Sequence, residues 1–361
     1  MVGLVVTIIS SPIIWTVSMK SRAYRPHVRR TIQDSRPQTE LRLLACVHDH
    51  ANIPSILNII ELTNATPDNP VCLYVMHLVE LVGRSTPMLI THLPHKKSAA
   101  GSSVFSAFHS YERQHEGSIV VQPFTSIAPY KTAHDDVCSV ALHKKVSLVI
   151  LPFQKQQLVP GSAYVMDNAL QIINPSVLAR APCSVGILVD RSGLSSRTVG
   201  LGDPSSHVYR MGVLFFGGPD DREALAYAAR MAEHPSVVLA VIRFLATDLS
   251  METMEEKPLD DELVGEFRLR SVDDVKICYH ETVVHDDEEA VRALCAINNS
   301  YDLMVVGRNQ WFDLDLAEGL SLWRENTELG AIGDMCTSSE FFGGKASVLV
   351  MQQQARAAAR R

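Results

Sequence analysis

The sequence lacks the motifs by which most enzymes are recognised. It contains no G-x-S-x-G elbow of a hydrolase, no G-x-x-x-x-G-K-[ST] phosphate loop, no G-x-G-x-x-G dinucleotide turn and no H-E-x-x-H zinc helix. No set of serine, histidine and aspartate can be assembled from it with any specificity. We therefore predict that the chain has no catalytic residues and is not an enzyme.

Paired cysteines are also missing. The chain has seven cysteines, and none of them belongs to a C-x-x-C pair. They lie mostly within or beside apolar segments, which is typical of buried free thiols in a reducing compartment and not of a disulfide framework or a zinc site. We therefore predict no metal centre. The cysteines are Cys46, Cys72, Cys138, Cys183, Cys278, Cys295 and Cys336.

Clustered positive charge is scarce as well. The formal net charge is −7 at pH 7, which argues against a nucleic-acid partner because binding to a phosphate backbone needs a basic face. Hydrophobic residues make up 46% of the chain and charged residues 20%, so most of it should fold. The length of 361 residues suits two domains of about 150 residues each.

One short basic cluster follows a run without any charge. Residues Met1–Met19 hold no charged side chain, and Lys20–Arg30 hold five basic ones. This order predicts the end of a transmembrane helix with a cytoplasmic anchor, whereas a signal peptide would have its basic residues first and a small-residue cleavage site afterwards. The bulk of the chain is then expected in the cytoplasm. An apolar helix at the first residue suggests that the chain is the tail end of something longer.

From Glu40 onward, short β-branched runs alternate with helical patterns, which predicts parallel sheets with helices on both faces. The order of the runs occurs twice, so we expect two tandem domains of five parallel strands each. The predicted strands are 41–47, 71–78, 118–124, 146–153 and 184–190, and then 209–216, 236–245, 275–284, 301–308 and 345–353. The predicted division is 1–19 as a partial or last transmembrane helix, 20–39 as a basic juxtamembrane linker, 40–190 as the first domain, 191–208 as a linker, 209–352 as the second domain and 353–361 as a tail.

The clearest internal repeat lies in two segments that begin with His-Asp-Asp, at His134 and at His285. Each leads from an acidic helix start through an amphipathic helix into a buried strand. Three adjacent side chains diverge, so we interpret both triplets as helix starts and not as metal ligands, and Thr132 and Asp135 have the spacing of a capping box. The acidic stretch 248–262 is predicted to be a loop.

A Gly-Gly pair marks a strand-to-helix turn of the kind where many α/β proteins hold a phosphate. In "VLFFGGPDDREALAYAARMAEHP", Gly217 and Gly218 allow a positive φ, and free N–H groups of the next helix could bind a phosphate. Asp220 and its acidic neighbours repel a phosphate and already complement the helix dipole. We predict that the loop mainly turns the chain, while Gly217, Gly218, Asp220 and Gly307 are the candidate contacts to a nucleotide.

Three polar residues follow the first predicted strand. His48, Asp49 and His50 lie where a ligand would sit over the carboxyl end of the sheet. Asp49 is therefore a candidate ligand-loop residue. His48 and His50 are candidate pH sensors, since histidine titrates near neutrality. The alternative is that they are exposed histidines without such a role.

Several segments taken together resemble a known family. They are "ELRLLACVHDHANIPSILNIIEL", "LYVMHLVELVGRSTPMLITH", "APYKTAHDDVCSVA", "VSLVILPFQKQ", "NPSVLARAPCSVGILVDR", "VLFFGGPDDREALAYAARMAEHP", "YDLMVVGR" and "ELGAIGDMCTSSEF". In this order they resemble the cytosolic C-terminal region of plant cation/H+ exchangers, which are monovalent cation/proton antiporters. The resemblance extends from about Lys20 to Gln354.

This resemblance implies a membrane antiporter whose last helix corresponds to Met1–Met19 and whose tail is regulatory. It implies a role in K+ and pH homeostasis at endomembranes or the plasma membrane. The family's transport core, a bundle of membrane helices with intramembrane acidic residues, is absent from this chain. The implied partners are therefore that membrane domain and, in a homodimer, a second copy.

Each half also resembles the universal stress protein fold, a five-stranded parallel sheet that holds ATP in some members. Those members carry a Gly-rich loop after the fourth strand. Pro152 and Phe153 stand at this point in the first half, and the second half keeps Gly307 without the spaced glycines that would cradle a triphosphate. No cofactor is therefore predicted. A membrane-anchored nucleotide-binding stress-type protein is the alternative to the antiporter tail.

Overall fold

A computed structural model describes residues 29–35, 39–81, 86–92, 102–153, 168–191, 208–246, 251–297, 301–309, 325–338 and 346–354. The first half contains strands β1 (Leu41–Val47), β2 (Val71–Glu80), β3 (Met88–Thr91), β4 (Ile119–Ala128), β5 (Leu148–Phe153) and β6 (Ser184–Val189), and helices α2 (Ile53–Leu62), α3 (Ser102–Gln114), α4 (Tyr130–His143) and α5 (Asn168–Arg180). The second half contains strands β7 (Tyr209–Phe215), β8 (Val237–Ala246), β9 (Ile277–Val284), β10 (Leu303–Gly307) and β11 (Ser347–Gln352), and helices α6 (Pro219–Ala232), α7 (Met251–Asp273), α8 (Asp287–Ala296) and α10 (Gly330–Thr337).

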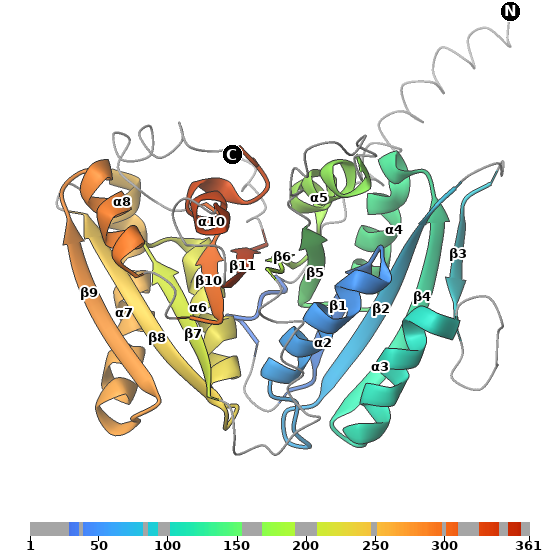
Figure 1. The fold of residues 1–361 in the computed structure, drawn as a ribbon, viewed down its shortest axis with the longest axis horizontal. Helices are drawn as coiled ribbons and strands as arrows, with labels where there is room; N and C mark the ends of the chain where they lie inside the picture. Colours follow the sequence, from blue (N-terminus) through green and yellow to red (C-terminus); the bar gives the residue numbers. More distant parts are fainter. Residues whose placement is uncertain are drawn as a thin grey trace, which may run out of the picture.

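All of these strands belong to one sheet. Its order is β3-β4-β2-β1-β5-β6-β11-β10-β7-β8-β9. Neighbouring strands are parallel except at two places, where β3 pairs antiparallel with β4 and β6 pairs antiparallel with β11. In Figure 1, β6 and β11 lie in the middle of the molecule, between the two halves.

The predicted α/β fold is confirmed, and the second half has the five parallel strands predicted for it, but a five-stranded sheet in each half is not confirmed. The first half contributes six strands, because the short antiparallel β3 adds to its outer edge. The two halves then share a single sheet, since the free edges of β6 and β11 satisfy each other's backbone hydrogen bonds. The register joins Val189 to Val348 and Val185 to Gln352.

Two layers of helices cover the sheet, and each layer runs across both halves. Helices α2, α3, α6 and α7 bury their apolar residues in one cluster, and helices α4, α5, α8 and α10 bury theirs in another on the opposite face. Strands β5, β6 and β10 are buried along their whole length. Such strands read as continuous apolar runs, because both of their faces lie in the core.

Two local predictions differ from the structure. The stretch 248–262 was expected to be a loop, yet from Met251 onward it is the first part of α7, where buried Asp260 is paired with Arg222 instead of being solvated. Helix α4 begins at Tyr130 after Pro129, so the capping box expected from Thr132 and Asp135 does not form. The second acidic start is confirmed, because Asp286 caps α8 by accepting a hydrogen bond from the Glu289 amide at 2.7 Å.

Among the described residues, no helix combines the length and apolar character needed to cross a membrane. The transmembrane segment predicted over Met1–Met19 lies outside the described residues, as do residues 192–207 of the predicted linker. The first described segment, residues 29–35, falls within the predicted juxtamembrane linker.

Candidate functional site

The start of helix α6 is a buried, charged turn at the junction of the two halves. Asp221 is fully buried and accepts three backbone hydrogen bonds. Its Oδ2 atom accepts from Phe216 at 2.7 Å and Gly217 at 2.9 Å, and its Oδ1 atom accepts from Gly307 at 2.9 Å. Burial raises the pKa of Asp221, although these N–H donors lower it. The side chain thus joins the ends of β7 and β10 through their backbones.

The Asp220 carboxylate likewise accepts hydrogen bonds from the segments that follow neighbouring strands. Its Oδ2 atom accepts from the backbone amide of Asn309 at 3.0 Å and from the side-chain amide of the same residue at 2.8 Å. Its Oδ1 atom accepts from the Gln353 backbone at 2.8 Å. Burial raises the pKa of Asp220, and the donors from Gln353 and Asn309 lower it. The carboxylate therefore binds the segments that follow β10 and β11.

The predicted ligand loop is already occupied by the protein's own carboxylates. Gly217 and Gly218 have φ values of 121° and 94°, so both need the freedom of glycine, as predicted for a turn. The Gly218 amide donates to Asp260 at 3.0 Å, and the amides of Gly217 and Gly307 donate to Asp221. These N–H groups are the ones that would otherwise face a phosphate.

We expect that millimolar ATP does not raise the melting temperature of the chain. A phosphate at this loop would have to displace Asp221 from its three N–H donors and would face the carboxylates of Asp220 and Asp221. Thermal unfolding with and without ATP is the measurement. A rise that disappears in Asp220→Ala would contradict this expectation and support the nucleotide-binding alternative.

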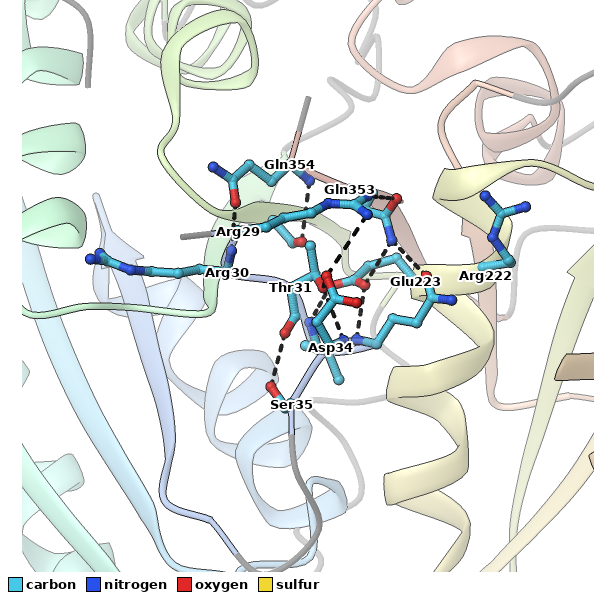
Figure 2. Close-up of polar contacts among 12 residues, drawn as sticks. Arg29, Arg30, Thr31, Asp34, Ser35, Arg222, Glu223, Gln353 and Gln354 are labelled. Carbon is cyan, nitrogen blue, oxygen red and sulfur yellow. Dashed lines mark hydrogen bonds and ion pairs between the residues drawn. The ribbon is translucent and has the colours of Figure 1, made fainter. Parts of the chain in front are cut away.

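A second feature of the junction is the segment of residues 29–35, which we call the strap. Figure 2 shows it packed against Glu223 of α6 and against Gln353 and Gln354, which follow β11. Glu223 is fully buried and accepts backbone hydrogen bonds from Ile32 at 2.6 Å and from Gln33 at 3.1 Å. Burial raises the pKa of Glu223, and these backbone donors lower it.

The strap contacts both halves of the molecule. The Arg30 guanidinium donates to the Leu142 carbonyl of α4 at 3.0 Å, and the Arg30 backbone amide donates to Gln354 Oε1 at 2.6 Å. Arg29 donates to the side chain of Gln353, whose own amide donates to Gln33 at 2.8 Å. The strap therefore lies across the junction and is bound to α4 of the first half and to the segment that follows β11 of the second half.

A cavity of about 580 Å³ lies beside the strap. Residues of α5, of the start of α6, of α7 and of the segments at and after the ends of β10 and β11 line it. Its lining residues are Arg29, Pro175, Leu178, Ala179, Pro219, Asp220, Glu256, Arg308, Asn309, Gln352, Gln353 and Gln354. A molecule bound there would contact the strap and both halves at once.

The histidines after β1 follow a strand that β5 separates from β6 in the sheet order. His48 has a buried Nε2 atom that is without a hydrogen-bond partner in the described part of the protein. Burial, and to a lesser degree the nearby His77, lower the pKa of His48 to about 4. The pKa of His77 is lowered by burial and then by His50 and His92. The strand ends of the first half thus bring several histidines together, whereas Asp49 is exposed and caps the short helix that follows it.

We expect the chain to lose stability as the pH falls from about 6.5 towards 4. The folded-state pKa of His48, about 4, lies below its unfolded value near 6.5, so the unfolded chain binds the proton first. The stability is present above pH 6.5 and is lost on acidification, by roughly 3 kcal/mol from this residue. Urea unfolding at several pH values measures the loss. His48→Phe should reduce it, while His280→Phe, at an exposed position on β9, should leave it in place.

Among the described residues, no group of three or more histidine, cysteine and acidic side chains is arranged to hold a metal ion. Sequence reasoning found Gly217, Gly218, Asp220 and Gly307, and the structure brings these residues together at one turn. It missed Glu223 and the strap. The available signal was a helix start in which Asp220, Asp221, Arg222 and Glu223 are all charged directly after a buried strand. All four side chains are at most 4% exposed.

Among solved structures, the chain is similar to a universal stress protein from Archaeoglobus fulgidus DSM 4304. The TM-score is 0.43 and the identity 11%, with 86% of this chain and 96% of that chain covered. It is also similar to a putative universal stress protein from Pseudomonas aeruginosa UCBPP-PA14, with a TM-score of 0.42, 12% identity, and coverage of 88% and 94%.

Two family profiles match the chain. One, described as "Plant cation/H(+) antiporter domain", covers residues 73–193, and the other, "Plant cation/H(+) antiporter, C-terminal domain", covers residues 208–352. Cation/H(+) antiporter 15 of Arabidopsis thaliana is 41% identical over 384 residues, which cover 98% of this chain and 46% of that protein. Cation/H(+) antiporter 14 of the same plant is 35% identical over 361 residues, which cover 97% and 43%. The chain spans less than half the length of these two relatives. It belongs to the plant cation/H(+) antiporter family.

Proposed function

We propose that the chain is the regulatory cytosolic portion of a monovalent cation/proton antiporter that exchanges K+ for protons in cation and pH homeostasis. The observation that carries this proposal is the position of the strap. Residues 29–35 begin at the end of the basic segment that, with the apolar segment before it, is predicted to anchor the chain in a membrane, and they are held at the junction between the two halves. Movement of the membrane-proximal segment would therefore act directly on the junction.

The family to which the chain belongs also supports this proposed function. The relatives are cation/H(+) antiporters more than twice as long as the part that this chain matches. A tail can bias transport only if its conformations differ in free energy between states of the transporter. The proposed partners are the membrane domain of the antiporter and, in a homodimer, a second copy. The proposed location is an endomembrane or the plasma membrane, with the bulk of the chain in the cytoplasm and no enzymatic activity.

A chimera tests the proposal. The corresponding C-terminal region of Cation/H(+) antiporter 15 is replaced by residues 20–361 of this chain, and K+-dependent proton exchange is measured in vesicles over the pH range in which histidine titrates. We expect exchange in the chimera, and a changed rate or pH profile when the tail is deleted. Equal rates and equal pH profiles with and without the tail, at equal amounts of protein in the membrane, would contradict a regulatory role.

A further inference from the structure

We propose that residues 29–35 are a releasable strap, and that Glu223, Gln353 and Gln354 form its docking surface. In the docked state the strap closes the junction, and in the released state the membrane-proximal segment is uncoupled from it. The inference rests on the proposed function for its role in transport. The docking itself follows from the contacts of the strap alone.

The docking surface recognises the backbone of the strap more than its side chains. The two carboxylate oxygens of Glu223 each accept one of two consecutive N–H groups, those of Ile32 and Gln33. Gln354 accepts the Arg30 amide. A fully buried carboxylate is costly unless donors surround it. The strap supplies two backbone donors to Glu223, and the side chains of Gln353, at 3.4 Å, and Ser184 also donate to it. The docked strap and the buried acid therefore depend on each other.

The internal hydrogen bonds of the strap allow it to detach from its docking surface as one unit. Its residues close a small turn of their own, in which Thr31 Oγ1 donates to Asp34 at 2.8 Å and Ser35 Oγ donates to the Thr31 carbonyl at 2.8 Å. Ile32, 7% exposed, is its one side chain in the apolar core cluster, whereas strands β5 and β6 are buried throughout. Segments with few apolar contacts open locally at a lower free energy than the core.

Release would be sensed at the junction because the strap crosses it. Arg30 is bound to α4 of the first half, while Arg29 and Gln33 are bound to Gln353 beyond the last strand of the second half. The Gln354 amide in turn donates to Ser184 of β6 at 3.4 Å. The strap, the segment after β11 and the first residue of β6 thus form one connected set of hydrogen bonds. Losing the strap removes this cross-link between the halves.

Hydrogen exchange of the full 361-residue chain in detergent micelles tests the docking. In Glu223→Ala we expect the amides of Ile32 and Gln33 to exchange at least about 100-fold faster, while amides of β1 and β7 keep their protection. Glu233→Ala is the matched control, because Glu233 is an exposed acid at the end of the same helix. Unchanged protection of the two strap amides in a folded Glu223→Ala chain would overturn the proposal.

A second variant covers the case in which Glu223→Ala does not fold. The double variant Gln353→Ala/Gln354→Ala keeps the buried acid but removes the side-chain contacts to the strap. We expect trypsin to cleave it after Arg30 at least about tenfold faster than the parent chain, since Thr31 is only 2% exposed when docked. Equal cleavage rates would mean that these contacts do not hold the strap.

The two proposals fail separately. If the variants leave hydrogen exchange of the strap unchanged, the strap proposal is refuted, even when deletion of the tail alters transport. If the variants release the strap but the transport of the chimera does not depend on the tail, only the proposed regulatory function is refuted. If both hold, Glu223→Ala in the chimera should shift the rate or pH profile towards that of the tail-deleted transporter, and Glu233→Ala should not.

Discussion

Gly307→Ala is expected to lower the free energy of unfolding by about 3 kcal/mol or more. A Cβ atom at position 307 would lie 2.6 Å from the Asp221 backbone nitrogen and 2.8 Å from the Asp220 carbonyl carbon. Neither atom can move away by a rotamer change, because both belong to the backbone at the start of α6. The helix would have to shift from the end of β10, and the hydrogen bond from Gly307 to Asp221 would be lost.

The matched control for this substitution is Gly265→Ala. Gly265 lies inside helix α7, and an added Cβ there meets nothing within 4 Å. Because alanine is the better helix former, this variant should be more stable than the parent chain by up to about 1 kcal/mol. Urea unfolding followed by far-ultraviolet circular dichroism measures both variants. A Gly307→Ala chain as stable as Gly265→Ala would show that the end of β10 does not pack against α6 as described.

Asp221→Ala is expected to have a comparable effect, a loss of about 4 kcal/mol. The substitution leaves the N–H groups of Phe216, Gly217 and Gly307 without their acceptor, and the amides of Gly217 and Gly307 are buried. Each unsatisfied buried donor costs about 1–3 kcal/mol, and the sum is reduced because the buried carboxylate is itself costly. The same unfolding measurement applies.

The substitution Asp221→Asn distinguishes the contributions of the three hydrogen bonds. In Asp221→Asn the remaining carbonyl oxygen can take the place of Oδ2 and keep the bonds from Phe216 and Gly217, while the amide group faces the Gly307 N–H. We expect roughly half the loss of the alanine variant. Asp68→Ala, at an exposed position in the loop before β2, should change stability by less than about 0.5 kcal/mol. An Asp221→Ala chain with an equally small change would refute the role of Asp221.

The fully buried strands were predictable from the sequence, whereas the short edge strand β3 and helix α7 were not. Strand β10 was predicted within a few residues, because a strand with both faces in the core is a continuous apolar run. Strand β3 has only four residues, three of them exposed, so it carries no such pattern. Helix α7 was predicted as a loop for a different reason. Its acidic residues are typical of a solvated segment, and the sequence does not show that Arg222, 38 positions before Asp260, pairs with them.

The candidate site was predictable only where it is local. The turn at Gly217 and Gly218 follows from two adjacent glycines between a strand and a helix. The docking of the strap could not be predicted in this way, because its acceptor Glu223 is 191 positions away from Ile32. The local sequence around either residue gives no sign of the other. The pairing of β6 with β11 is non-local in the same sense, since any two free strand edges can satisfy each other.

The pairing of β6 with β11 also has a consequence for biosynthesis. Strand β11 is the last strand of the sheet in the chain, yet it lies at the centre of the sheet order. The chain is synthesised from its N-terminus, and Val189 of β6 pairs with Val348 of β11. The edge of β6 therefore stays unpaired until more than 150 further residues have been added. Throughout this period the nascent first half carries an open, mostly apolar strand edge, which is the kind of surface that chaperones bind and that aggregates. A premature stop before β11 would make this state permanent, so such products should be degraded instead of accumulating as a folded first half.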